Sequence, residues 1–315
     1  MGREDVLDQA ERRTAAAVAR RYYLDGESKV DIAADLGLSR FKVARLLDQA
    51  KRSGMVRIEV VEPVDDAVLE LAAQVRDRWG LRECWVVPDS DAPQQDVGRA
   101  AGELLGRLLG PQDVLGMPWS RSGHAMVDAL TTLPRVPVVQ LSGAAATTPV
   151  DSSTVDIVRR ASRIAGGGRQ VFFAPLVMPD AEAAEAVRRD VAVRDTLGAA
   201  STVTVAMVGV GAWAPGESTI HDLVDDAARE KVAAAGAVGE IAGVFFDDRG
   251  RLVQTSVSRR VIALSGEQLS AIPTVLASCH QPARAPALAA AVRGGLVTAL
   301  VVTAEVAEAL LELSP

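Results

Sequence analysis

The stretch SKVDIAADLGLSRFKVARLLDQAKRSGMVRIEV, residues 28–60, has the pattern of two short helices joined by a tight turn. Apolar residues at helical spacing in its first part predict a helix over Lys29–Leu36. Gly37 then permits the left-handed backbone that turns a chain within a few residues. Ser39 follows as a good N-cap and predicts a second helix over Arg40–Arg52. Together these features predict a pair of helices with a short connection.

A helix over residues 8–24 is predicted to precede this pair. The segment LDGES ends it, and Ser28, the last residue of that segment, can cap the next helix. In the last helix, Val43, Leu46 and Leu47 face inward, while cationic residues gather at its start and on its outer side. This order is typical of a helix-turn-helix, whose last helix reads base edges in the DNA major groove. The alternating apolar residues of SGMVRIEV predict a small wing strand after it.

Three kinds of DNA contact are predicted for this part of the chain. Backbone N–H groups at the start of the helix at 29–36 can meet a phosphate. Arg40 or Arg45 can contact guanine, whereas Lys29, Lys42 and Arg52 are better placed for phosphates. The predicted DNA-binding residues are Ser28, Lys29, Ser39, Arg40, Phe41, Lys42, Arg45 and Arg52. The alternative, a helical hairpin with a solvated charged face, agrees less well with the turn glycine and the capping serine.

The bulk composition fits two unequal domains in a chain of 315 residues. Aromatic residues make up only 3% of the chain, so a core of Ala, Val, Leu and Ile is expected, which suits helices packed on a largely parallel sheet. Two cysteines are too few for a disulfide framework. No apolar run reaches the length of a membrane span, and the start of the chain is charged rather than signal-like. We therefore expect a cytoplasmic protein with no membrane partner.

The charges are unevenly distributed. The formal net charge is −7, which by itself argues against a nucleic-acid partner. Residues 1–62, however, carry 12 Lys/Arg and 11 Asp/Glu, whereas the remainder carries 22 and 30. An acidic C-terminal part can accompany a DNA-binding N-terminal part if the N-terminal cations share one face.

Beyond a junction at residues 61–66, short apolar stretches alternate with stretches rich in Ala, Leu and Arg. This alternation predicts a parallel, doubly wound α/β sheet. Two segments depart from it: FFDDRGRLVQ predicts a hairpin around Gly250, and Val257–Leu264 predicts a further strand. The other predicted strands are Cys84–Val87, Val114–Met117, Val138–Leu141, Val171–Ala174, Val203–Val208, Val244–Phe246, Val275–Ala277 and Val297–Val302.

Polar and glycine-rich segments follow several of these strands. In open α/β sheets, ligands bind beyond the carboxyl ends of the strands. In PWSRSGHAMVDAL, hydroxyls, backbone N–H groups and the guanidinium of Arg121 at a helix start can hold an anion. Each such loop alone is more often a tight turn, and Cys279-His280 is too sparse for a metal site. Their shared position predicts a small polar, anionic ligand such as a phosphorylated sugar or polyol.

Eight collinear segments resemble the SorC family of sugar-responsive bacterial transcription regulators, which includes the deoxyribonucleoside and central glycolytic gene repressors. The resemblance implies a helix-turn-helix DNA-binding domain over residues 1–60. It also implies an effector-binding and oligomerisation domain over 61–315, with a Rossmann-like fold similar to glucosamine-6-phosphate deaminase. Dimers or tetramers would then bind operator DNA under the control of a phosphorylated sugar. The segments are residues 22–60, VLGMPWSRSGHAMVDAL, VVQLSGA, VFFAPL, VAMVGVGAW, GAVGEIAGVFFDDRG, RRVIALSGEQLSAIPTVLAS and AAAVRGGLVTALVVTAEVAEALLEL.

The resemblance carries over to individual residues. Trp119–Gly123 matches the phosphate-side motif, Ser142-Gly143 matches the next ligand loop, and Arg284 falls where many members carry Lys. Asp156 matches a polar ligand contact. The predicted effector-binding residues, which include those that follow other strand ends, are Trp119, Ser120, Arg121, Ser122, Gly123, Ser142, Gly143, Asp156, Gly209, Gly211, His280, Gln281 and Arg284.

Two departures from the family pattern affect the predicted pocket rim. His280 and Gln281 stand where members often show a Gly-Gly pair, and Thr303-Ala304-Glu305 replaces a common Thr-Asp-Glu. They leave open whether the effector is phosphorylated.

Two other classes of function compete with a regulator. A sugar-phosphate isomerase or deaminase would need an acid–base set, but the candidates, His221-Asp222, Glu240 and His280, are scattered along the sequence. A purely structural oligomerisation module leaves the polar loops unexplained. We therefore expect a regulator without catalytic residues, metal or cofactor, with operator DNA, a sugar-like effector and further copies of itself as partners.

Overall fold

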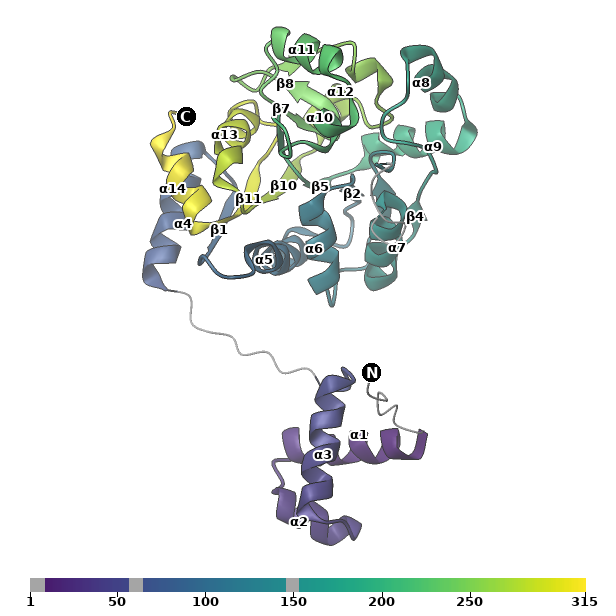
Figure 1. The fold of residues 1–315 in the computed structure, drawn as a ribbon, viewed down its shortest axis with the longest axis vertical. Coiled ribbons are helices and arrows are strands. Elements are labelled where there is room, and N and C mark those ends of the chain that lie inside the picture. Colours follow the sequence, from purple (N-terminus) through teal and green to yellow (C-terminus); the bar gives the residue numbers. More distant parts are fainter. Residues whose placement is uncertain (1–8, 57–64, 146–152) are drawn as a thin grey trace. The chain divides into compact units, whose positions relative to one another are not determined.

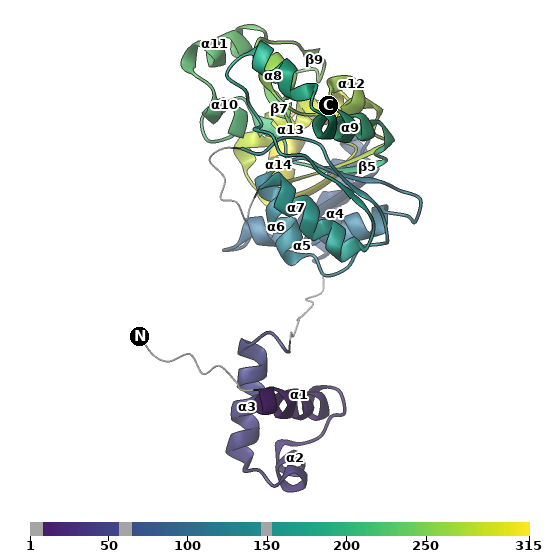
Figure 2. The same ribbon diagram turned by 90° about the vertical axis from the view of Figure 1, so that its right-hand side faces the viewer.

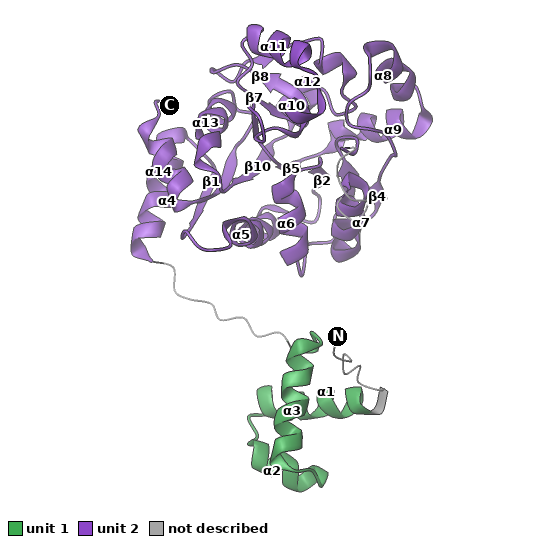
Figure 3. Cartoon of the chain, in the orientation of Figure 1, with its two compact units in different colours: residues 1–63 green, residues 64–315 purple. Residues whose placement is uncertain are grey.

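The computed structural model of the chain describes residues 9–56, 65–145 and 153–315. The chain forms two compact units, an N-terminal unit of residues 1–63 and a C-terminal unit of residues 64–315 (Figure 3). Most of the predicted wing strand lies within residues 57–64, outside the described residues. None of the helices in the described ranges has the length and apolar character that a membrane crossing requires.

The N-terminal unit consists of helices α1 (Gln9–Tyr23), α2 (Lys29–Leu36) and α3 (Arg40–Arg52). The predicted caps are present: the N–H of Asp31 donates to Ser28 Oγ, and the N–H of Lys42 donates to Ser39 Oγ. Gly37 ends α2 in the left-handed conformation, with a φ of 63°. The buried core residues of all three helices are Ala15, Val18, Ala19, Ile32, Ala33, Val43, Leu46, Leu47 and Ala50. The predicted helix-turn-helix is therefore confirmed, and α2 and α3 begin and end at the predicted residues.

The C-terminal unit is built on a seven-stranded sheet in which every pair of neighbours is parallel (Figure 1). The strand order is β1-β11-β10-β5-β2-β3-β4. Runs of Val, Leu and Ala suit these strands, since both faces of the sheet are covered. The bounds are β1 Glu83–Val87, β2 Leu115–Met117, β3 Val138–Gln140, β4 Arg169–Gln170, β5 Val205–Val208, β10 Thr274–Cys279 and β11 Ala299–Thr303.

Helices cover both faces of this sheet, and successive strand residues pack on opposite sides. Val205 and Met207 of β5 share a core with α5, α6 and α7, which Figure 2 shows together below the sheet. Ala206 and Val208 of the same strand pack with α4, α13 and α14. The doubly wound α/β fold is thus confirmed. These helices are α4 Asp66–Trp79, α5 Pro93–Leu108, α6 Arg121–Ala129, α7 Thr154–Ala165, α13 Ala285–Arg293 and α14 Ala304–Glu312.

A second, antiparallel sheet departs from the parallel pattern. The predicted strand at Val244–Phe246 exists, but as β8 it belongs to this four-stranded sheet, of order β6-β7-β8-β9. The predicted hairpin around Gly250 is confirmed as the β8–β9 pair. The remaining strands and helices are β6 Gly211–Ala212, β7 Gly239–Ile241, β9 Leu252–Val253, α8 Ala181–Arg188, α9 Val191–Ala199, α10 Thr219–Leu223, α11 Asp226–Ala234 and α12 Gly266–Ala271.

Two predicted strands are wrong as regular elements. The strand predicted at Val171–Ala174 does not form, and β4 covers only Arg169–Gln170. Beyond it, the N–H of Phe172 donates to the side-chain Oε1 of Gln140 instead of to the backbone of a neighbouring strand. The segment predicted as a strand at Val257–Leu264 begins with a short 3-10 helix and then makes isolated bridges through Val261 and Ala263. Side-chain hydrogen bonds between Thr255 and Ser258 turn the chain there.

We predict that Gly250→Ala destabilises the C-terminal unit. Gly250 has a φ of +72°, and a Cβ atom at this position would lie 2.3 Å from the backbone oxygen of Ala290. The left-handed backbone and this overlap are expected to lower the free energy of unfolding by about 1–3 kcal/mol. Urea unfolding measures the change. Gly106→Ala is the matched control, because Gly106 lies within α5 with open space around it. It should stabilise the unit by up to about 1 kcal/mol, and equal effects of the two substitutions would contradict this account of the hairpin.

Candidate functional site

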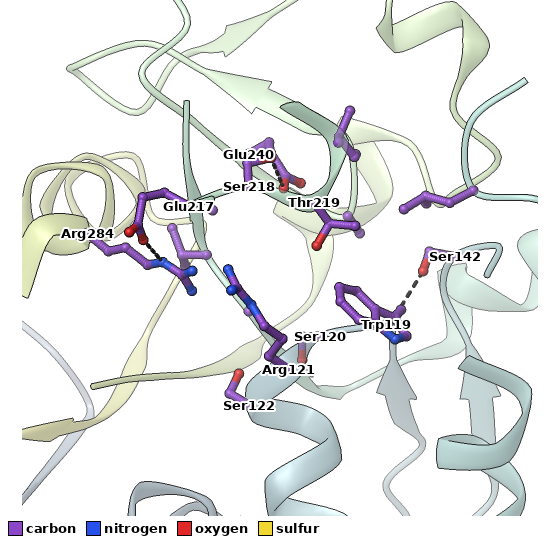
Figure 4. Close-up of a pocket in the computed structure, with 16 residues that line it drawn as sticks. Trp119, Ser120, Arg121, Ser122, Ser142, Glu217, Ser218, Thr219, Glu240 and Arg284 are labelled. Carbon is purple, nitrogen blue, oxygen red and sulfur yellow. Dashed lines mark hydrogen bonds and ion pairs between the residues drawn. The ribbon is translucent and has the colours of Figure 1, made fainter. Parts of the chain in front are cut away.

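The candidate effector site is a pocket where loops after four strands of the parallel sheet converge (Figure 4). The open space between the lining residues amounts to about 490 Å³, a figure that includes solvent at the mouth of the pocket. The predicted effector residues that line it are Trp119, Ser120, Arg121, Ser122, Ser142, Gly209, Gly211 and Arg284. They come from the loops after β2, β3, β5 and β10.

The start of α6 forms one wall of this pocket. Ser120 is its N-cap, and the Oγ of Ser120 accepts a hydrogen bond of 2.9 Å from the N–H of Gly123. Gly123 therefore supports the wall without lining the pocket. The N–H of Trp119 donates to Ser142 Oγ at 3.0 Å, which ties the end of β2 to the end of β3. Hydrogen bonds therefore fix both the loop after β2 and the loop after β3.

Two guanidinium groups point toward each other on one side of the pocket, from Arg121 on α6 and from Arg284 before α13 (Figure 4). Arg121 donates to the carbonyl oxygen of Gly216 at 2.9 Å. The Nε of Arg284 donates to Glu217 Oε2 at 2.6 Å, but its buried Nη2 has no hydrogen-bond partner within the described residues. Burial and the nearby charge of Arg284 lower the pKa of Arg121, while Glu217 and Asp222 oppose that shift. A cationic pair with an unused donor is suited to receive an anion.

Acidic residues that the sequence analysis did not assign to the effector complete the pocket. Glu240 of β7 is buried, and its two carboxylate oxygens accept hydrogen bonds of 2.9 Å from Ser218 Oγ and from the N–H of Gly243. Burial raises the pKa of Glu240, and these hydrogen bonds oppose the shift. Glu217 and Ser218, which precede α10, and Thr219, its first residue, also line the pocket. The polar run Glu217–Thr219 directly after Gly216 is a sequence signal that could have identified these three residues. Glu240 could have been identified as the single acidic residue in the apolar run GEIAGVFF.

The other predicted effector residues lie outside the pocket lining. The N–H of Gly143 donates to the carbonyl of Ile262, and Asp156 lies in the first turn of α7, 3.8 Å from Arg160. His280 is half-buried, and burial together with the charges of Arg284 and Arg121 lowers its pKa. Gln281 follows it, and its carbonyl accepts a hydrogen bond from Cys279 Sγ. The part of the loop before Asp156 that spans residues 146–152 lies outside the described residues.

Three of the residues considered for an enzyme, His221, Asp222 and Glu240, have defined partners in the described structure. His221 lies 3.3 Å from Asp222 and packs edge-on against Trp213, whereas Glu240 is held by Ser218 and Gly243. No group of three His, Cys, Asp or Glu side chains that could hold a metal ion occurs among the residues that the structure describes.

The candidate nucleic-acid interface lies on α3. Arg40, Phe41, Arg45 and Arg52 are exposed, as the prediction requires. Lys42 instead lies with its Nζ 3.4 Å from Glu11 Oε1 on α1. The remaining predicted residues are Ser28 and Ser39, which cap α2 and α3, and Lys29, whose Nζ lies 5.3 Å from the ring centre of Tyr22.

Comparison with known proteins relates both units to transcriptional regulators. Residues 66–312 match the family model described as "Putative sugar-binding domain". The transcriptional regulator LsrR of Escherichia coli (strain K12) is 30% identical over 314 residues, which cover 96% of this chain and 95% of that protein. LsrR of Klebsiella pneumoniae subsp. pneumoniae is 29% identical over 317 residues, or 98% of this chain and 95% of that protein.

Solved structures show the same fold. The full-length sorbitol operon regulator SorC from Klebsiella pneumoniae superposes with a TM-score of 0.73 at 21% identity, and the match covers 96% of this chain and all of that chain. A DeoR family transcriptional regulator from Listeria monocytogenes gives a TM-score of 0.70 at 24% identity over 78% of this chain and all of its own. With a matching domain family and relatives along nearly its full length, this chain belongs to the family described as "Putative sugar-binding domain" and is related to the transcriptional regulator LsrR.

Proposed function

We propose that this protein is a transcription regulator whose affinity for operator DNA is controlled by a small phosphorylated sugar or polyol bound in the pocket of the C-terminal unit. The observation that carries the proposal is the convergence of Arg121 and Arg284 on one pocket beside the start of α6. Guanidinium groups and free N–H groups at a helix start are the partners that a phosphate group prefers. The unused Nη2 donor of Arg284 supports a site for an anion.

The opposite wall of the same pocket suits the hydroxyl groups of a sugar. Ser218, Thr219 and Glu240 line this wall, and all three carry oxygen atoms that can accept hydrogen bonds from hydroxyls. The ligand would therefore lie with its phosphate toward the guanidinium pair and its hydroxyls toward the second sheet. The uneven distribution of charge in the pocket gives the ligand one preferred orientation.

Control of DNA binding requires the ligand to distinguish two states of the protein. A ligand that binds one state ~10²-fold more tightly shifts the equilibrium by roughly 2.7 kcal/mol. In the proposed mechanism the two states are dimers or tetramers that differ in how well two N-terminal units match the spacing of operator half-sites. No catalytic step is involved, and the protein acts in the cytoplasm, where operator DNA and phosphorylated sugars meet.

A thermal-shift screen tests the anion site. At 100 times its dissociation constant a ligand contributes about 2.7 kcal/mol to the stability of the folded protein, which corresponds to a rise in Tm on the order of 5–10 °C. The probes are glucose 6-phosphate, ribose 5-phosphate and glycerol 3-phosphate, each beside its unphosphorylated parent. We expect at least one phosphorylated member to raise the Tm and its parent to have a much smaller effect. Equal shifts with phosphorylated and unphosphorylated members would contradict the proposal.

Substitution of the guanidinium groups tests their assignment. Arg121→Ala and Arg284→Ala are each expected to weaken binding of that ligand by about tenfold or more, since a hydrogen bond to a charged group contributes about 1.5–3 kcal/mol. Isothermal titration measures the change. Arg99→Ala is the matched control, because Arg99 is exposed on α5 and pairs only with Asp96 among the ion pairs of the described residues. Unchanged affinity in both pocket variants would mean that the ligand binds elsewhere.

Two substitutions on α3 distinguish base contacts from phosphate contacts. Arg45→Ala should lower the ratio of operator affinity to random-DNA affinity by the equivalent of about 1–3 kcal/mol. Arg52→Ala should weaken binding to both kinds of DNA alike and reduce the slope of log K against log salt concentration by about 1. Fluorescence anisotropy at several salt concentrations gives both quantities. If both variants lower the ratio of operator affinity to random-DNA affinity by the same factor and reduce the salt slope by the same amount, the proposed division of roles is wrong.

A further inference from the structure

The most exposed large apolar side chain of the described N-terminal unit lies on the helix proposed to read DNA. Phe41 is the second residue of α3, and its side chain is 87% exposed. It takes no part in the core that holds the three helices together. A single exposed apolar residue is common on protein surfaces, but the position of Phe41 and the residues around it are unusual for such a residue.

Phe41 belongs to the face of α3 that points away from the core. Residues three and four positions apart share a helix face, which places Phe41 beside Ala44 and Arg45. Ala44 is half-buried and Arg45 is exposed, whereas Val43 and Leu46 are fully buried on the other side. The outward face therefore begins with an aromatic ring and continues with a methyl group and a guanidinium group.

The chemistry of this face matches the edge of a base pair. In the major groove the thymine C5-methyl group is the apolar group that side chains such as Phe and Ala contact, and guanine offers the acceptors that suit Arg. A phosphate offers no comparable apolar group to a phenyl ring. The first turn of a recognition helix is also the part that reaches base edges.

We propose that Phe41 is a specificity-determining residue that recognises thymine through the C5-methyl group in the major groove. The inference rests on the proposed DNA-binding function and adds the base that one side chain reads. Charge favours DNA over a second copy of this chain as the partner of the face. Arg40 and Arg45 flank Phe41 and are exposed, so two copies of the face would bring like charges together, whereas DNA brings opposite charge.

The test compares thymine with uracil, which lacks only the methyl group. The full-length protein first selects its preferred sites from a library of random duplexes. Each thymine of the selected site is then replaced singly by uracil, and the affinity is measured for the wild-type protein and for Phe41→Ala. The exposed position of Phe41 leaves the core intact in the variant, and circular dichroism checks that the helices are retained. Leu24→Ala is the matched control, because Leu24 is 75% exposed but lies after α1 rather than on α3.

We expect the wild-type protein and Leu24→Ala to lose about fourfold in affinity at one thymine of each half-site, the equivalent of ~0.8 kcal/mol for one methyl group. Phe41→Ala should bind thymine and uracil equally at that position. Two results would overturn the inference while leaving DNA binding intact: equal wild-type affinity for thymine and uracil throughout the site, or the same loss in wild type and Phe41→Ala. A library that yields no preferred site would instead contradict the proposed function itself.

Discussion

The parallel direction of all seven strands of the larger sheet is the constraint on which the candidate site depends. Because the strands run the same way, their carboxyl ends share one edge, and the loops that follow them meet there. Strand β5 lies between β10 and β2, so the segments that carry Arg121, Gly209 and Arg284 converge although they are far apart in the sequence. Reversal of any one of these strands would carry its loop to the opposite edge and remove one wall of the pocket.

The pocket keeps its charges close together but only partly compensated. Glu217 binds one side of the Arg284 guanidinium, and the carboxylate of Glu240 is already held by Ser218 and Gly243. Two partly buried cations therefore share the space with two acidic side chains, of which Glu217 is paired with Arg284 and Glu240 is hydrogen-bonded to uncharged groups. A buried charge is costly unless it is paired and hydrogen-bonded, so an anionic ligand would complete an arrangement that the protein alone leaves incomplete. Burial, together with the charges of Arg284 and Arg121, lowers the pKa of His280.

Much of the fold could be predicted because local chemistry decides it. Ser28, Gly37 and Ser39 fix the ends of α2 and α3, and runs of Val and Leu indicate strands that are buried on both faces. The loop after β2 could be predicted as part of a site from its hydroxyls and its arginine. Glu217 and Glu240 could not be assigned to the pocket from the sequence, because β7 and the segment between β6 and β7 bring them there through contacts distant in sequence. The length of β4 could not be predicted either, since the side chain of Gln140 takes the place of a backbone partner.

The central claim is that a ligand in the C-terminal unit changes the affinity of the N-terminal unit for DNA. The most direct measurement is the operator affinity of the full-length protein with and without a saturating phosphorylated ligand, in the wild type and in Arg121→Ala. We predict a change on the order of 100-fold in the wild type, a response of the variant only at ligand concentrations about tenfold higher or more, and equal affinities when no ligand is present. A ligand that binds the pocket but leaves the operator affinity of the wild-type protein unchanged would contradict the central claim.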